Sequence, residues 1–292
     1  DVLHLLPGDG ETVGAALVEH PDVIGVCFTG STTVAKLINR TLAAKDGPIP
    51  VLIAETGGLN GMFVDTTALR EQVMDDVVMS AFNAAGQRCS ALRILFLPDE
   101  TADMIMEGLE GAMDALVIGD PRNAITDVGP VIDKDAFNEL QNYLDTLPKT
   151  MKIRKQCEIP PHLEDGYFMA PAMIEVSSLD GFDHEKFGPF LHVVRYKSGE
   201  LDELMTEFAA KNYGLTLGIH SRLESFAKRV TDAVPAGNIY INRNVIGAVV
   251  GVQPFGGMGL SGTGPKAGGP HYVARFATEV TVTNNITAQG GD

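Results

Sequence analysis

The sequence predicts an α/β protein built mainly on parallel sheets, and three observations lead to this prediction. Short apolar and β-branched runs alternate with stretches of helical periodicity along most of the chain. The turn Phe28-Thr29-Gly30-Ser31-Thr32 closes one such run and opens a helical one, as in cofactor-binding βαβ units. The length of 292 residues and the hydrophobic content of 45% allow a large buried core.

The expected elements follow along the chain in alternation. We expect helices over residues 11–19, 32–42, 67–85, 101–116, 136–147, 201–210 and 223–234, and strands over 4–6, 23–28, 51–54, 91–97, 167–176, 191–196, 215–220 and 238–242. Residues 145–165 are polar and contain prolines, which indicates a surface connection with a short strand near Lys152. Residues 251–269 hold eight glycines, a composition typical of loops that approach another group closely. The tail, residues 276–286, is rich in Thr and Val like an edge strand that pairs with another subunit.

Composition argues against several classes of protein. The formal net charge is −16 and no cluster of Lys and Arg occurs, which disfavours a nucleic-acid surface. Cys27, Cys89 and Cys157 are too few and too widely spaced for a disulfide framework or a zinc site, so we expect a reducing compartment and no metal. No apolar run is long enough to span a bilayer. We expect a cytoplasmic protein.

The stretch Gly86-Gln87-Arg88-Cys89-Ser90 contains the candidate nucleophile. An apolar helical segment, a glycine and a cation precede Cys89, and such a setting favours ionisation of a thiol. The alternative for a lone cysteine is a small buried hydrophobe. Cys27, in an apolar strand, and Cys157, in a polar connection, fit that alternative.

Two glycine-rich turns are candidates for binding cofactor phosphates. The segment from Gly8 to Gly14 nearly matches the dinucleotide fingerprint GxGxxG but carries one residue too many. Ser31 lies where a strand meets a helix, among small residues whose backbone N–H groups can face an anion. An ordinary helix N-cap by Ser31 or Thr32 is the alternative.

Five motifs resemble those of the aldehyde dehydrogenase superfamily and occur in the family's order. They are Phe28-Thr29-Gly30-Ser31-Thr32, Glu55-Thr56-Gly57-Gly58, Gly86-Gln87-Arg88-Cys89, Glu185-Lys186-Phe187-Gly188-Pro189 and Pro254-Phe255-Gly256-Gly257. Residues 81–93 and 237–269 are most similar to the L-glutamate γ-semialdehyde (1-pyrroline-5-carboxylate) dehydrogenase module of bifunctional proline utilization A proteins. The resemblance covers essentially all 292 residues and departs from the family at Ala35 and Thr56, where many members have Gly and Leu.

The resemblance implies an aldehyde dehydrogenase-like α/β fold with a partial Rossmann-type cofactor domain. Its expected parts are a partial NAD-binding domain in 1–56, a catalytic domain in 57–260, a return to the NAD-binding domain in 261–277, and an oligomerisation strand and tail in 278–292. The chain resembles the C-terminal three-fifths of such a module. The family's oxyanion-hole asparagine and adenosine-ribose lysine would lie upstream, and losing one oxyanion donor typically costs about 10²–10³ in rate. We therefore expect the chain alone to be nearly inactive.

The implied reaction is NAD-dependent oxidation of L-glutamate 5-semialdehyde to L-glutamate, the second step of proline catabolism. A Cys89 thiolate adds to the aldehyde, and the thiohemiacetal transfers hydride to the nicotinamide. Glu55 then acts as the base that activates water to hydrolyse the thioester, and the backbone N–H of Cys89 is one oxyanion donor. A surface carboxylate or helix cap is the alternative for Glu55.

The resemblance also implies which residues bind the cofactor and the substrate. NAD would contact Gly8, Ser31, Val34, Gly57, Glu185 and Phe187, with the pyrophosphate near Ser31 and the nicotinamide ribose on Glu185. The semialdehyde would contact Ser90, Gly247, Ala248 and Phe255, with its α-carboxylate on the oriented amides of Gly247 and Ala248. A plain loop is the alternative for Gly247 and Ala248.

Two other functions stay open at this stage. A relative that passes the acyl group to coenzyme A would leave Glu55 idle, and a non-catalytic module would serve assembly through residues 276–286. The implied partners are an amino-acid semialdehyde and a second copy of the chain, as a homodimer or higher homo-oligomer. FAD would belong only to a proline dehydrogenase part of a longer polypeptide, which could associate peripherally with the inner membrane. The preference for NAD over NADP is undecided.

Overall fold

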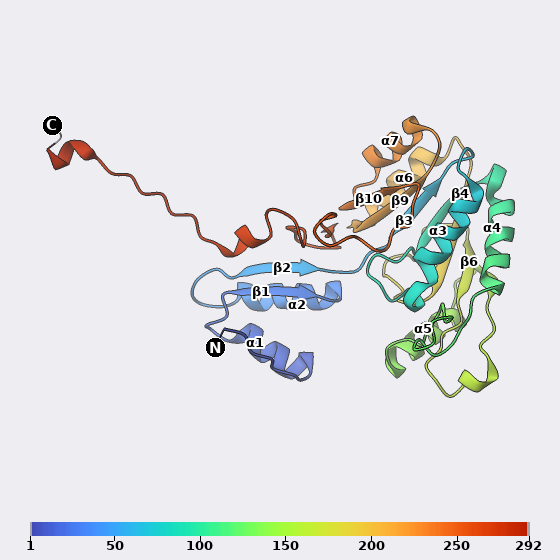
Figure 1. The fold of residues 1–292 in the computed structure, drawn as a ribbon, viewed down its shortest axis with the longest axis horizontal. Coiled ribbons are helices and arrows are strands. Elements are labelled where there is room, and N and C mark those ends of the chain that lie inside the picture. The colour runs from blue at the N-terminus through green and yellow to red at the C-terminus, as the bar shows by residue number, and fades with distance from the viewer. Residues whose placement is uncertain (1, 291–292) are drawn as a thin grey trace.

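Two mainly parallel sheets of different size carry the fold in the computed structural model, which describes residues 2–290 (Figure 1). The smaller sheet has two strands and lies on the N-terminal side, and the larger has seven strands. The prediction of an α/β protein with mainly parallel sheets is therefore confirmed. Among the described residues, no helix is long and apolar enough to cross a bilayer.

The small sheet is a single βαβ unit. Strands β1 (Gly25–Thr29) and β2 (Val51–Glu55) pair in parallel, and α2 (Thr32–Ala43) connects them. A π-helical turn, Gly10–Gly14, and α1 (Ala15–Glu19) precede it, which confirms the expected helix over 11–19. The strand expected over 4–6 is wrong, because these residues are exposed and no neighbouring strand bonds to them.

The large sheet collects strands from the rest of the chain. In the order β10-β9-β3-β4-β7-β6-β5 these strands are β10 (Asn238–Ile241), β9 (Thr216–His220), β3 (Gly61–Val64), β4 (Ile94–Pro98), β7 (Phe190–Tyr196), β6 (Ala172–Val176) and β5 (Met151–Gln156). All neighbours are parallel except β5, which runs antiparallel to β6. The sequence did not predict β3, because a buried run of four residues is too short to show a period.

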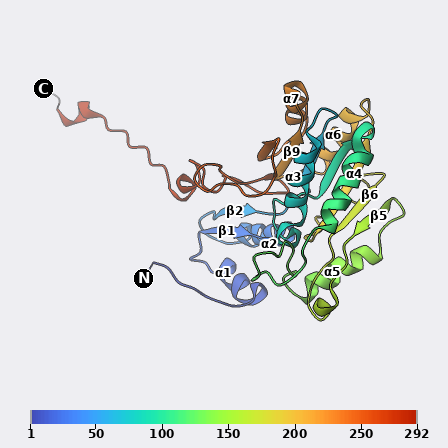
Figure 2. The same cartoon turned by 45° about the vertical axis from the view of Figure 1, so that its right-hand side comes forward.

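Helices cover both faces of the large sheet (Figures 1 and 2). They are α3 (Arg70–Phe82), α4 (Asp99–Asp114), α6 (Leu201–Ala210) and α7 (Glu224–Ala233), and α5 (Lys134–Asp145) lies below them in Figure 1. The chain moves in one direction across the sheet through α3 and α4 and in the other through α6 and α7. Right-handed crossovers therefore place the two pairs on opposite faces.

The glycine-rich segment after β10 packs against the end of β2. Thr263 Oγ1 accepts from the Ala54 N–H at 2.9 Å, and the Thr56 N–H donates to the Ser261 carbonyl at 3.0 Å. A short antiparallel pair, β8 (Tyr213–Gly214) with β11 (Met258–Gly259), ties the same segment to the large sheet. Residues distant in sequence thus join the two sheets.

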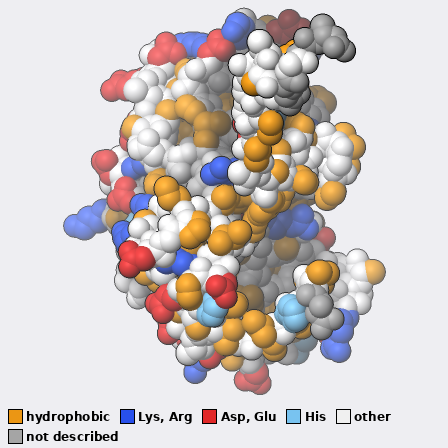
Figure 3. All heavy atoms as spheres, turned by 90° about the vertical axis from the view of Figure 1, so that its left-hand side faces the viewer, with side chains coloured by type: hydrophobic (Ala, Val, Ile, Leu, Met, Phe, Trp, Pro, Cys, Tyr) orange, Lys and Arg blue, Asp and Glu red, His pale blue; other side chains and the backbone are white. Residues whose placement is uncertain are grey.

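The tail extends away from both sheets (Figure 1). Short 3-10 turns occur at Val273–Phe276 and Ile286–Gln289, and no strand forms between them within the chain. Val280 and Val282 are exposed. Figure 3 shows the molecule from the side of the tail and the small sheet, and hydrophobic side chains lie at the surface of that face. Pairing of this tail with another subunit remains a prediction.

A cluster of three aromatic rings should anchor the large sheet. Phe63 and Phe96 stack with centroids 4.2 Å apart, and Phe208 meets both rings edge-on. We expect Phe96→Ala to lower the free energy of unfolding by about 3–5 kcal/mol, because it removes a fully buried ring and leaves a cavity. Urea unfolding followed by circular dichroism measures this, with Val280→Ala as the exposed control, for which a change within about 0.5 kcal/mol is expected. Equal effects would contradict the prediction.

Candidate active site

The candidate site lies where two sheet edges of opposite polarity meet. Residues at the carboxyl ends of β1 and β2 border it on one side. Residues that precede β4, β7 and β9, at the amino edge of the large sheet, border it on the other. A cavity of about 670 Å³ occupies this junction. It is lined by Thr29, Gly30, Ser31, Thr32, Thr33, Glu55, Thr56, Gly57, Cys89, Glu139, His184, Glu185, Phe187, Tyr213, Leu215 and Phe255.

Seven of the residues that the sequence singled out line this cavity together. They are Ser31, Glu55, Gly57, Cys89, Glu185, Phe187 and Phe255. Five others are not among the lining residues: Gly8, Val34, Ser90, Gly247 and Ala248. Within the described residues no group of three or more His, Cys, Asp or Glu side chains is placed to hold a metal ion.

A left-handed turn delivers the nucleophile from α3. Ala84 and Ala85 have φ values of 55° and 54°, and Gly86 follows with 65°. A Cβ on Gly86 would overlap the carbonyl of Gly188, so only glycine allows the two backbones to approach. The helix expected over 67–85 therefore ends early, at Phe82, and Cys89 lies on a loop pressed against the turn that precedes β7.

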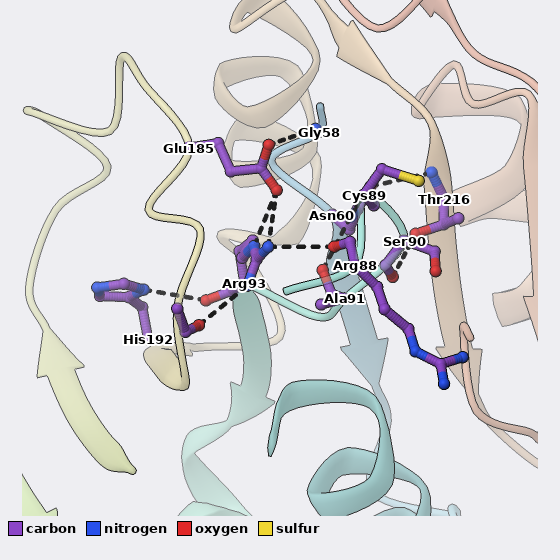
Figure 4. Close-up of polar contacts among 11 residues, drawn as sticks. Gly58, Asn60, Arg88, Cys89, Ser90, Ala91, Arg93, Glu185, His192 and Thr216 are labelled. Carbon is purple, nitrogen blue, oxygen red and sulfur yellow. Dashed lines mark hydrogen bonds and ion pairs between the residues drawn. The ribbon is translucent and has the colours of Figure 1, made fainter. Parts of the chain in front are cut away.

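Asn60 fixes the loop that carries Cys89 (Figure 4). Its side-chain amide donates to the carbonyls of Cys89 at 2.7 Å and Ala91 at 2.8 Å, and its Oδ1 accepts from the Thr216 N–H at 3.1 Å. Thr216 Oγ1 in turn donates to the Ser90 carbonyl at 3.2 Å. One fully buried amide thus attaches the nucleophile loop to β3 and β9.

The Cys89 thiol is harder to ionise than the sequence suggested. Burial raises its pKa, the charges of Glu185 and Glu55 raise it further, and the backbone N–H groups of Ser90 and Cys89 lower it. The expected help from Arg88 is wrong for this structure, because its guanidinium points away from the thiol (Figure 4). In this state the thiol is therefore the favoured form at neutral pH.

Glu55 ends β2 and faces the cavity half-buried. Its Oε2 accepts from the Gly257 N–H at 3.1 Å, whereas its Oε1 is buried without a hydrogen-bond partner. Burial raises the pKa of this carboxyl to about 7, although the Gly257 N–H and the charge of Lys266 oppose the rise. A carboxylate with one free oxygen and a pKa near neutrality is suited to accept a proton.

Glu185 is held by a guanidinium that the sequence did not single out. Arg93 Nε and Nη2 donate to its Oε1 at 3.1 and 2.8 Å, and the Gly58 N–H donates to its Oε2 at 3.2 Å. Burial raises the pKa of Glu185, and Arg93 lowers it. Phe187, two residues along, places its ring 5.3 Å from the Arg93 guanidinium carbon.

The start of α2 offers the cavity an anion-binding end. Ser31 is the N-cap, with its Oγ accepting from the Val34 N–H at 3.2 Å, so the capping alternative is real. Thr32 and Thr33, in the first turn, also line the cavity. Gly57 allows the Glu185 carboxylate to lie directly against the backbone that follows β2, because a Cβ there would overlap Glu185 Oε2. These features fit the phosphate and ribose of a dinucleotide.

The residues assigned to the substrate carboxylate lie on a separate loop after β10. Gly247 is exposed and has a φ of 75°, and Ala248 is half-buried. Ser90 is buried, with its carbonyl bonded to Thr216. Gly8 is exposed in an irregular segment, and the described residues 2–7 before it form no strand, whereas a strand leads into the first glycine of a dinucleotide fingerprint.

Arg93 and Asn60 hold the site together and were both missed by sequence reasoning, as were the lining residues Glu139, His184, Tyr213 and Leu215. Arg93 and Asn60 are polar residues at the start of runs that become buried strands, and both are at most 2% exposed. A buried polar group requires partners, so an Asn or Arg directly before an apolar run was the available signal. Their partners lie up to 156 residues away along the chain, which no local pattern reveals.

Comparison with known proteins agrees with this geometry. The family model described as "Aldehyde dehydrogenase family" matches residues 1–282. The bifunctional protein PutA of Escherichia coli K12 is 51% identical over 284 residues, which is 94% of this chain. That match spans 21% of the relative's length, so the chain covers about a fifth of it.

Solved structures share the fold closely. A crystal structure of bifunctional proline utilization A superposes with a TM-score of 0.92 at 55% identity, covering 97% of this chain and 28% of that one. A 1-pyrroline-5-carboxylate dehydrogenase from Thermus with bound NAD gives 0.86 at 33% identity, covering 93% and 52%. The family match over residues 1–282, together with the cysteine and glutamate at one cavity, shows that the chain belongs to the aldehyde dehydrogenase family.

Proposed function

We propose that this chain forms part of an enzyme that oxidises L-glutamate γ-semialdehyde to L-glutamate with NAD. The observation that carries the proposal is the meeting of Cys89, Glu55 and Glu185 at one cavity between the two sheets. The names of similar proteins, PutA and 1-pyrroline-5-carboxylate dehydrogenase, and the NAD bound to one of them support the substrate and the cofactor.

The reaction begins at the sulfur of Cys89. Its thiolate adds to the aldehyde carbon and forms a thiohemiacetal, whose oxygen carries negative charge. The backbone N–H groups of Cys89 and Ser90, which face the thiol, are the oxyanion donors that this loop offers. The thiol must lose a proton to water first, and the same two N–H groups favour this loss because they lower the pKa of Cys89.

The cofactor would lie between the two sheets. Bound NAD supplies the hydride acceptor that turns the thiohemiacetal into a thioester. Ser31 and the first turn of α2 would hold its pyrophosphate, and Glu185 with Phe187 would hold the nicotinamide ribose. Gly57, which lines the cavity beside Glu185, would also contact NAD. Gly8 and Val34 remain proposed contacts outside the lined cavity.

Glu55 completes the cycle as the hydrolytic base. Its Oε1 has no protein partner in the cavity and can accept a proton from a water molecule. That water attacks the thioester carbon, the thiolate of Cys89 leaves, and the acid is released. The Gly257 N–H keeps the other carboxylate oxygen in place during this step.

The α-carboxylate of the substrate would bind the loop after β10. Oriented amides at Gly247 and Ala248 can bind an anion without a cation, and the positive φ of Gly247 provides such an orientation. Ser90 would assist with its hydroxyl, and Phe255, which lines the cavity, would pack on the aliphatic part.

We also propose the domain limits 1–56, 57–260, 261–277 and 278–292, with the last as an oligomerisation strand.

The function is tested by NADH formation from the semialdehyde, with the native polypeptide that contains these residues. We expect Cys89→Ser to lower kcat by about 10³-fold or more, because a serine hydroxyl ionises far less readily than a thiol and Cys89 is the one cysteine among the described residues that line the cavity. Cys27→Ser is the matched control and should retain wild-type activity, because Cys27 in β1 is exposed; the expectation that it is a small buried hydrophobe is wrong. An active Cys89→Ser enzyme, or a wild type that forms no NADH, would refute the proposal.

Loss of the base should separate the two half-reactions. In Glu55→Gln we expect a burst of NADH followed by slow turnover, with acyl-Cys89 accumulating, and rapid quench with peptide mass spectrometry measures both. In the wild type, hydrolysis should fall about tenfold from pH 8 to pH 6, because protonation of a carboxyl with pKa about 7 removes the base. Burst kinetics absent from the variant, or an acyl group removed only by added coenzyme A in the wild type, would contradict this role.

Substrate choice should depend on Ser90. We expect Ser90→Ala to raise KM for the semialdehyde about tenfold, because one hydrogen bond to a charged carboxylate is lost. KM for propanal, which has no carboxylate, should stay unchanged, and steady-state kinetics with both aldehydes measures the difference. An unchanged KM for the semialdehyde would exclude Ser90 from substrate recognition.

A further inference from the structure

We propose that Arg93 is a positioning residue that clamps the carboxylate of Glu185 to the turn that carries Cys89. The inference rests on the proposed function, in which Glu185 binds a ribose and Cys89 attacks the aldehyde. It goes further by naming the group that sets the spacing between the two. Arg93 itself does not line the cavity, so it acts through its neighbours.

Four hydrogen bonds from one guanidinium define the clamp (Figure 4). Two go to Glu185 Oε1, from Nε at 3.1 Å and from Nη2 at 2.8 Å. Nη1 donates to the Gly188 carbonyl at 3.0 Å, and Nη2 also donates to the Arg88 carbonyl at 3.2 Å. Arg88 directly precedes Cys89 in sequence, so the same side chain holds the nucleophile loop and the turn that carries Glu185.

Backbone packing closes the clamp from the other sides. Gly86 and Gly188 approach so closely that a Cβ on Gly86 would overlap the carbonyl that Arg93 binds. On the opposite side of Glu185, a Cβ on Gly57 would overlap its Oε2. The carboxylate therefore lies between the Arg93 guanidinium and the backbone that follows β2, and it has little room to rotate.

A second layer holds the main chain of Arg93. His192 Nδ1 lies 3.0 Å from the Arg93 carbonyl, and its Nε2 lies 2.7 Å from the Tyr143 hydroxyl. Burial lowers the pKa of His192 to about 4, so the ring is neutral and Nδ1–H donates to the carbonyl at physiological pH. The start of β4 is thus fixed independently of the guanidinium contacts.

The chemistry of the clamp requires arginine. The side chains of Arg93 and Glu185 are 2% and 12% exposed, and removing one partner of a buried pair leaves an uncompensated charge. A lysine ammonium is a point charge that cannot reproduce the planar fork that reaches three acceptor groups. Phe187 adds a ring over the guanidinium, with its centroid 5.3 Å from the central carbon.

The clamp also sets the pH range in which Glu185 is charged. Burial raises the pKa of Glu185, whereas the charge and hydrogen bonds of Arg93, and to a smaller extent the Gly58 N–H, lower it. Cys89 and Tyr213 also face Glu185, and their own pKa values are raised first by burial and then by the charge of Glu185. Glu55, Glu139 and His184 share the cavity. Loss of the Arg93 charge should therefore raise the pKa of Glu185 further.

The test is NAD affinity as a function of pH, measured by titration calorimetry from pH 5.5 to 9 on the native polypeptide. A ribose-binding carboxylate loses affinity for its ligand as pH falls through the pKa of the carboxyl. Glu55 titrates in the same cavity, so the part of the acid limb that disappears in Glu185→Gln is the part that reports Glu185. In Arg93→Gln we expect this limb to move to higher pH and NAD to bind about tenfold more weakly at pH 7. In Arg93→Lys the retained charge should leave the limb near its wild-type position, while the lost fork lowers kcat more than it changes KM for NAD.

Two further variants keep the outcome decisive. If Arg93 acts through Glu185, adding Arg93→Gln to Glu185→Gln should weaken NAD binding by less than twofold beyond the single variant. Arg154→Gln, which removes a surface guanidinium paired with Glu110 on the far edge of the sheet, should leave the profile unchanged. An unmoved acid limb in folded Arg93→Gln would overturn the clamp alone. Wild type that binds no NAD would overturn the proposed function and the clamp with it.

Discussion

The buried ion pair between Arg93 and Glu185 is the interaction on which the candidate site depends. It joins the start of β4 to the turn before β7, and through the Arg88 carbonyl it reaches the nucleophile loop. The residues directly before β4 and β7 are not part of a strand, so no backbone hydrogen bonds of the sheet hold them together. Side-chain hydrogen bonds from Arg93 do so instead. A charge pair this deeply buried is costly unless its remaining donors are satisfied, and here they are given to backbone carbonyls.

The site lies at the amino edge of the large sheet, not at its carboxyl edge. In open α/β sheets ligands usually bind beyond the carboxyl ends of the strands, and the small sheet obeys this rule with Thr29 and Glu55. The large sheet contributes from its opposite edge, because β2 runs directly into the loop that begins β3. Because the carboxyl edge of the small sheet faces the amino edge of the large sheet, the N-terminus of α2 and the loop that carries Cys89 line the same cavity.

Burial in this cavity opposes ionisation of its acidic groups, and at Glu185 the Arg93 charge partly offsets that effect. Glu55 and Glu185 lie near a thiol in a partly buried space, and burial raises the pKa of all three groups. The resting thiol is thereby protected from ionisation, whereas Glu55, with a pKa of about 7, can exchange a proton near neutrality. Such a separation of roles among titratable groups is typical of acid–base sites.

The sequence by itself determined the alternation of strands and helices, the family, and the group of motif residues that share one cavity, because these depend on local periodicity and on short contiguous motifs. Only the tertiary structure decided the roles of Asn60 and Arg93, whose partners are distant in sequence. It also reversed the expected ionisation of Cys89, since burial and two carboxylates outweigh a neighbouring cation that points elsewhere. It removed the strand expected over 4–6, because a strand exists only where another strand bonds to it.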